Sequence, residues 1–205
     1  MRAYLHHPYP IHQGDVLCRD LELSAPFKLP HSGQGAEFGL FYLADASVPG
    51  ITGVMGMIAG ASFDNVSQTQ HCKQGESHTT EVHAAGTTRN RLGYTRGLAQ
   101  EYHIPQVDPT PMCLDSSTTI FASLDDSAVK RALWLRNRIW VLRQGVQHKE
   151  FAPFKIPEAD NAADVHTKYL PFPRWWKHVC FMNNLTEARM AKCIERLHKI
   201  RLVSE

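Results

Sequence analysis

Four acidic residues stand where predicted elements of regular structure begin or end. Asp45 closes a predicted strand, Glu81 lies in the first turn of a predicted helix, and Asp115 ends a later strand. Asp164 lies on a predicted helix that follows the last strand. Carboxylate oxygens are hard ligands of the kind that Mg²⁺ prefers, and clustered carboxylates repel one another until a cation binds, so at least one pKa should rise. The four residues are therefore candidate metal ligands if the fold brings them together.

Short apolar runs and turn residues predict the elements that must position these carboxylates. Residues 38–45 (FGLFYLAD) and 51–61 are typical of buried strands. A third strand is expected from 63–67 and the segment 71–77 beside it, and the three strands would form an antiparallel unit. The other expected elements are a helix from Ser77 to about Tyr102, strands at 112–115 and 150–156, and helices at 118–124, 129–144, from 161 or 162, and 186–202. This order favours an α/β fold with a five-stranded mixed sheet flanked by helices.

The small net charge of the 205-residue chain, +2, hides an uneven distribution. Residues 37–126 carry ten acidic and four basic side chains, whereas residues 127–149 carry six basic side chains and no acidic one. An acidic region that gathers cations beside a basic surface that holds phosphates is typical of metal-dependent nucleic-acid enzymes. The alternative interpretation of the basic run is a solvated helix face.

Composition excludes several classes of protein. No run of about 20 apolar residues could span a bilayer, so no membrane association is expected. The net charge is too small for a histone-like coat on nucleic acid, and a hydrophobic fraction of 43% fits a globular protein with a sizeable core. Five scattered cysteines without a Cys-x-x-Cys pair predict reduced thiols and an intracellular location.

Five short motifs follow one another along the chain. They are 42–47 (YLADAS), the hairpin 52–70, the helix start 77–85 (SHTTEVHAA), 113–117 (CLDSS) and 163–170 (ADVHTKYL). In this order they resemble the ribonuclease H domain of copia-type retrotransposon polyproteins. The last motif is similar to the Ala-Asp-Ile-Phe-Thr-Lys-Pro-Leu ending of that domain. The chain departs from the family at Thr79, where a glutamate is usual, and at Ser116 or Ser117, where an asparagine is usual.

The resemblance implies a ribonuclease H-like fold and a metal-dependent endonuclease that cuts the RNA strand of RNA-DNA hybrids. The acidic positions of the family fall on Asp45, Glu81, Asp115 and Asp164. Two Mg²⁺ ions, which Mn²⁺ could replace, would activate a water and stabilise the leaving 3′-oxygen. Asp45 is expected to ligate both ions. Glu81 and Asp115 would complete one site and Asp164 the other.

Substrate contacts are expected from polar residues near the carboxylates and from the basic run. The 2′-hydroxyls of an RNA strand lie in a wide, shallow minor groove, where side chains can reach them. The residues expected to read these hydroxyls or to hold phosphates are Ser47, Thr79, Ser116, Lys130, Arg131, Arg136, Arg138 and Lys168. Solubility alone is the alternative role for the basic residues.

A second function from a different class stays open. A domesticated ribonuclease H-like fold could serve as an RNA-binding or structural subunit of a large ribonucleoprotein, with structured RNA as its partner. The nuclease hypothesis implies an RNA-DNA hybrid and a reverse transcriptase as partners. The nuclease fits a cytoplasmic particle, and the domesticated subunit fits an organelle or the nucleus. An integrase of the same superfold is disfavoured, because integrases use three carboxylates and lack the Ala-Asp-x-x-Thr-Lys motif.

Three regions are expected along the chain. Turn-forming residues and the lack of a periodic run indicate an irregular N-terminal extension at 1–36. The ribonuclease H-like domain is expected at 37–173, and a basic helical extension at 174–205.

Overall fold

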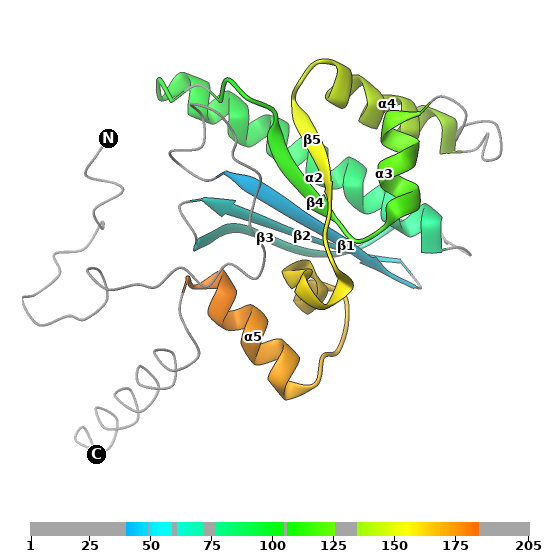
Figure 1. The fold of residues 1–205 in the computed structure, drawn as a ribbon, viewed down its shortest axis with the longest axis vertical. Coiled ribbons are helices and arrows are strands. Elements are labelled where there is room, and N and C mark those ends of the chain that lie inside the picture. The colour runs from blue at the N-terminus through cyan, green and yellow to red at the C-terminus, as the bar shows by residue number, and fades with distance from the viewer. Residues whose placement is uncertain are drawn as a thin grey trace, which may run out of the picture.

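The fold is described from a computed structural model. The residues that it describes are 40–48, 50–58, 61–71, 77–104, 106–125 and 135–184. The expected N-terminal extension, the expected helix at 186–202, and Lys130 and Arg131 lie outside these residues. Within them, the chain forms one mixed sheet with helices on both faces (Figure 1).

The sheet has five strands in the order β3-β2-β1-β4-β5. Their bounds are β1 Phe41–Ser47, β2 Ile51–Ile58, β3 Ala61–Thr69, β4 Thr110–Leu114 and β5 Phe151–Lys155. The first three strands pair antiparallel through short connections, whereas β4 runs parallel to β1 and β5 runs parallel to β4. The predicted five-stranded mixed sheet, with its first three strands antiparallel and helices on its flanks, is confirmed.

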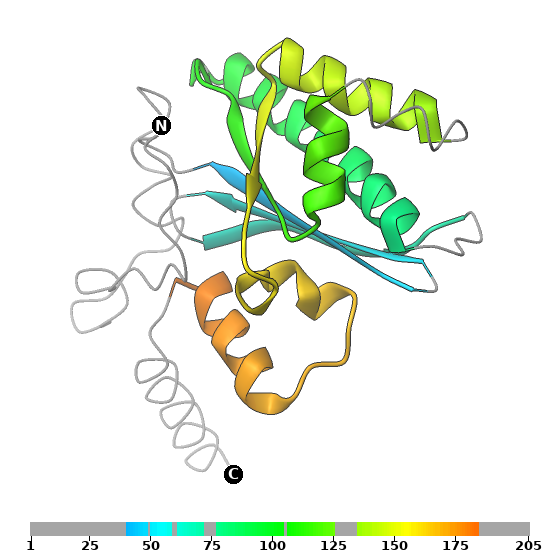
Figure 2. The same ribbon diagram turned by 45° about the vertical axis from the view of Figure 1, so that its right-hand side comes forward.

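Helices cover both faces of this sheet. Their bounds are α2 Ser77–Glu101, α3 Ser117–Leu124, α4 Arg136–Gln147, α5 Phe172–Met182 and the 3₁₀ segments η4 Glu158–Asp160 and η5 Ala162–His166. Helices α2, α3 and α4 lie on one side, and η5 and α5 lie on the other (Figure 2). No helix within the described residues is long and apolar enough to cross a membrane.

Two of these segments differ from the sequence prediction. The helix expected to carry Asp164 is a single 3₁₀ segment, of the short kind in which such helices usually occur. Helix α5 was not predicted, although its first turn contains Pro173, which is common at a helix start. It crosses the boundary expected between residues 173 and 174, and its Phe181 is buried in the core. The residues of α5 therefore pack as part of the folded unit.

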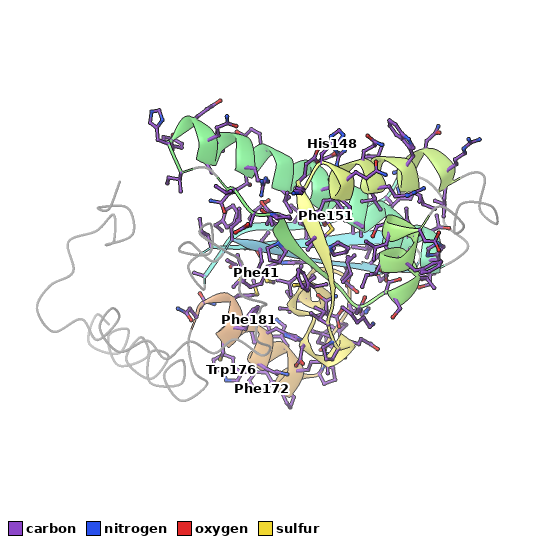
Figure 3. The ribbon with its side chains drawn as sticks, turned by 45° about the horizontal axis from the view of Figure 1, so that its top comes forward. Phe41, His148, Phe151, Phe172, Trp176 and Phe181 are labelled. Atoms are coloured by element: carbon purple, nitrogen blue, oxygen red, sulfur yellow. The ribbon has the colours of Figure 1, made fainter. Side chains whose placement is uncertain are left out.

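Alternating side chains along β1 divide the core between the two faces. Tyr42 packs with residues of α2, α3 and α4, whereas Phe41 packs with residues of η5 and α5. Figure 3 shows Phe151 on the α4 side of the sheet, and Phe41 with Phe181 on the other side. The ring centroids of Phe41 and Phe181 are 6.4 Å apart. Because Asp45 follows Phe41 by four residues along the strand, its side chain points to the η5 side.

Candidate metal centre

Asp45 and Asp115 lie beside each other where the parallel pairing of β1 with β4 ends. Strands β1 and β4 pair with Ala44 opposite Leu114, so the next residue of each strand is one of the two acids. Parallel strands end at the same edge of a sheet, which is where α/β folds usually place their sites. Asp115 follows Cys113 by two residues, so the two side chains point to the same face of the sheet. Cys113 is buried in the core on the η5 side of that sheet. Both carboxylates are therefore positioned by the pairing of β1 with β4.

Glu81 reaches the same edge from helix α2. It is the fifth residue of the helix, so it lies in the second turn and not in the first turn as predicted. One carboxylate oxygen each from Asp45, Glu81 and Asp115 lies within 4.8 Å of the other two. Oxygen Oε2 of Glu81 is buried without a hydrogen-bond partner. A buried carboxylate oxygen without a partner is costly, so these three residues, hereafter the triad, fit a divalent cation with oxygen ligands.

Burial and repulsion raise the pKa values of the triad. Burial, followed by the nearby charge of Asp164, raises the pKa of Asp45 to about 7. Burial, followed by the charge of Asp45, raises the pKa of Glu81 to about 9, and burial also raises the pKa of Asp115. The predicted rise in pKa is confirmed. The N-terminus of α2 does not keep Glu81 ionised, because burial outweighs a helix dipole that acts mainly on the first turn.

Asp164 lies on η5, fully buried, and its carboxylate contacts two cationic side chains. The ammonium nitrogen of Lys168 is 3.1 Å from Oδ1 of Asp164 and 3.4 Å from Oδ1 of Asp45. The guanidinium of Arg174 donates to Oδ2 of Asp164. Partial burial acts to lower the pKa of Lys168, but the carboxylates of Asp45 and Asp164 outweigh it and raise that pKa. Asp164 is thus linked to the triad through Lys168.

Hydrogen bonds hold η5 against the sheet. The side-chain amide of Asn161 donates to the carbonyl oxygen of Ala44 at 3.0 Å, next to Asp45. Its own oxygen accepts from the backbone N–H of Ala163 at 3.2 Å, which caps η5. At the other end of η5, the hydroxyl of Ser67 donates to the carbonyl oxygen of His166 at 2.6 Å. These contacts fix the backbone that carries Asp164.

Gly53 on β2 allows η5 to come close to the sheet. A Cβ atom at this position would lie 2.7 Å from the carbonyl oxygen of Ala163 and 2.7 Å from Cγ2 of Thr167. No larger residue fits without moving η5, which is a usual reason for glycine in a strand. The close approach also lets the hydroxyl of Thr167 donate to Oδ2 of Asp45.

The polar residues predicted to contact nucleic acid differ in their access to solvent. Ser47 and Ser116 are partly exposed beside the acidic residues, and Ser116 also caps α3 by accepting from the N–H of Thr119 at 3.3 Å. Thr79 is only 1% exposed, and its buried hydroxyl has no partner. The burial of Thr79 argues against a direct contact with nucleic acid. Lys168 contacts carboxylates in this structure, as described above.

Two basic residues at the start of α4 lie exposed. Arg136 and Arg138 both face solvent. Burial, followed by the charge of Arg138, lowers the pKa of His83 on α2 to about 4. His83 follows Glu81 by two residues, so Arg138 lies near the N-terminal part of α2, the helix that carries Glu81. Arg136 and Arg138 therefore form an exposed basic surface beside that part of α2.

Three residues of the site were not predicted from the sequence. Thr167 lies inside a motif that was recognised, but its contact with Asp45 crosses 122 positions of the chain. Asn161 has a local signal, because asparagine before a short helix is a favoured N-cap. Arg174 has no local signal, since its partner Asp164 lies ten positions earlier and on a different helix.

Comparisons with known proteins add little to this geometry. No model of a protein family matches the chain, and no curated protein matches it. Among solved structures, it is similar to the crystal structure of RNase H1 from the halophilic archaeon Halobacterium salinarum NRC-1. The two share 15% sequence identity over 60% of this chain and 88% of that chain, with a TM-score of 0.36.

Proposed function

We propose that this chain is a metal-dependent endonuclease that cleaves the RNA strand of RNA-DNA hybrids. The observation that carries the proposal is the convergence of Asp45, Glu81 and Asp115 at one edge of the sheet, with Oε2 of Glu81 buried and unpartnered. The strand order of the sheet and the resemblance of the motifs support the same activity.

The roles of the residues follow from their positions. Asp45, Glu81 and Asp115 would hold Mg²⁺, which Mn²⁺ could replace. When bound, the ion would supply an activated water and positive charge for the leaving 3′-oxygen. Asp164, the expected extra ligand of a second ion, already contacts two cationic side chains. Thr167 orients Asp45 through its hydrogen bond.

Contacts with the substrate would come from two regions. Ser47 and Ser116 lie beside the acidic residues, where they could reach the 2′-hydroxyls of an RNA strand. Arg136 and Arg138 on α4 would hold backbone phosphates, since both are exposed and Arg138 lies near His83 of α2. Lys130 and Arg131 are proposed to extend this basic surface.

Cleavage of a labelled RNA-DNA hybrid in Mg²⁺ tests the proposal. The full chain is expected to cut the RNA strand, and Asp45→Asn is expected to lose at least 100-fold in rate, because it removes one ligand charge. Glu101→Gln is the matched control, since Glu101 is exposed at the far end of α2. A wild-type chain that binds Mg²⁺ but leaves the hybrid intact would contradict the proposal.

One observation favours the alternative of a ribonuclease H-like subunit that binds structured RNA without cutting it. The carboxylate of Asp164 is already neutralised by Lys168 and Arg174, as in a site that no longer needs its fourth acid as a ligand. The alternative expects salt-dependent binding of structured RNA and no cleavage of any hybrid. Cleavage by the wild type that is lost in Asp45→Asn would rule it out.

The origin that we propose is the ribonuclease H part of a copia-type polyprotein, with reverse transcriptase as the partner. The motifs at 42–47, 77–85 and 163–170 support it by their order and spacing. Sequencing of the transcript that encodes the chain tests it. A reverse transcriptase reading frame upstream is the expected result, and unrelated coding sequence would contradict it.

A further inference from the structure

The position expected for a second metal ion contains an ammonium group. A second ion was predicted between Asp45 and Asp164, and Nζ of Lys168 lies 3.4 Å and 3.1 Å from one oxygen of each. The backbone supports this placement, because the N–H of Lys168 donates to the carbonyl oxygen of Asp164 at 2.9 Å. Lys168 therefore contacts Asp164 twice, through its side-chain ammonium and through its backbone N–H.

The remaining oxygens of these two acids are also engaged. Oδ2 of Asp164 accepts from Arg174, and Oδ2 of Asp45 accepts from Thr167. Glu81 differs, since its Oε2 is buried without any hydrogen-bond partner. The carboxylate oxygen that still lacks a partner therefore belongs to the triad, whereas the oxygens of Asp45 and Asp164 already have partners.

Charge also separates the two positions. A divalent ion beside Asp164 would lie within a few ångströms of two positive side chains, Lys168 and Arg174, in a partly buried site where repulsion is weakly screened. The lysine has little room to leave by a shift of its backbone. Gly53 brings η5 so close to β2 that Ala163 and Thr167 lie at contact distance.

We propose that Lys168 takes the place of the second divalent ion, so that the site binds one ion, at the triad of Asp45, Glu81 and Asp115. The inference rests on the proposed function, because it concerns the metal of that same site. Arg174 holds Asp164 in position, and Asp164 in turn holds Lys168. The ammonium supplies positive charge beside Asp45 whatever the concentration of free metal, whereas the ion at the triad depends on that concentration.

The number of Mn²⁺ ions bound per full-length chain tests the inference without measuring activity. Titration followed by electron paramagnetic resonance of the free ion, with calorimetry as a second method, is expected to give one ion for the wild type. Lys168→Met, which keeps an unbranched side chain as far as Cε and removes the ammonium group, is expected to bind two. Lys168→Arg is expected to bind one Mn²⁺ ion, as the wild type does, because it keeps a positive charge at this position.

A lysine outside the site provides the matched control. Lys177 pairs with Asp160 at 2.6 Å and does not contact the triad, so Lys177→Met is expected to bind one ion. Two ions on the wild type would overturn the inference and leave the proposed nuclease intact. One ion on a folded Lys168→Met chain would also overturn it. A wild type that binds no ion would overturn the proposed function itself. The number of ions bound by the wild type is a test that does not depend on the folding of any variant.

Discussion

At the residue scale, Glu81 makes the stability of the metal-free protein depend on pH. Its pKa rises from an ordinary 4.5 to about 9 in the fold, chiefly through burial. Between these values the folded protein keeps a proton that the unfolded chain releases, so the free energy of unfolding falls as the pH rises. The contribution is complete below pH 4.5 and is lost as the pH passes through about 9. Asp45 acts in the same direction between 3.8 and about 7.

Urea unfolding in EDTA measures this dependence. We expect Glu81→Gln to lose less stability than the wild type as the pH rises from 5 to 9, by up to about 1.4 kcal/mol per pH unit, the limit for one linked proton. The reason is that glutamine has no proton to exchange. Glu101→Gln, at an exposed position, should keep the wild-type slope. Identical slopes for Glu81→Gln and the wild type would contradict the pKa shift.

At the scale of elements, the metal centre depends on how η5 docks against β2. Gly53→Ala would place a Cβ atom 2.7 Å from the backbone of Ala163, so η5 must move. We expect a loss of about 1–3 kcal/mol in the free energy of unfolding, and weaker Mn²⁺ binding because the hydrogen bond from Thr167 to Asp45 is disturbed. Denaturant unfolding and Mn²⁺ titration measure the two effects.

A second glycine provides the control for this prediction. Gly93 is exposed on α2, and a Cβ atom there would meet nothing within 4 Å. Gly93→Ala should therefore stabilise the protein by about 0.5–1 kcal/mol, as alanine usually does inside a helix. If both alanine variants behave alike, the docking of η5 is not limited by Gly53.

At the scale of the whole molecule, a bound cation should stabilise the fold, because it binds the assembled triad and not the unfolded chain. At a Mg²⁺ concentration 100 times the dissociation constant, we expect a gain of about 2.7 kcal/mol. Thermal unfolding in Mg²⁺ and in NaCl of equal ionic strength measures it. Asp45→Asn should gain much less, whereas Asp160→Asn, outside the triad, should gain as much as the wild type. Equal stabilisation by NaCl would contradict a specific site.

Much of the fold and the three candidate ligands of the site were predictable because their signals are local. Apolar runs mark the strands, and Asp45 and Asp115 follow two of them directly. The spacing of apolar residues marks α2, which carries Glu81. The 3₁₀ form of η5 was not predictable in this way, because it depends on close packing against the sheet at Gly53 more than on local periodicity. Helix α5 was not predicted although its sequence carries a local signal, since Phe172, Trp176 and Val179 recur at helical spacing.

The sequence alone therefore determined which carboxylates follow apolar runs and which stands on α2, since apolar runs and helix starts are local patterns. Only the tertiary structure decided what surrounds Asp164. The chain turns between η5 and α5 and brings Arg174 back to that acid, while the close approach at Gly53 sets Lys168 between Asp45 and Asp164. Contacts of this kind depend on the path of the chain through space, which no local pattern of residues specifies.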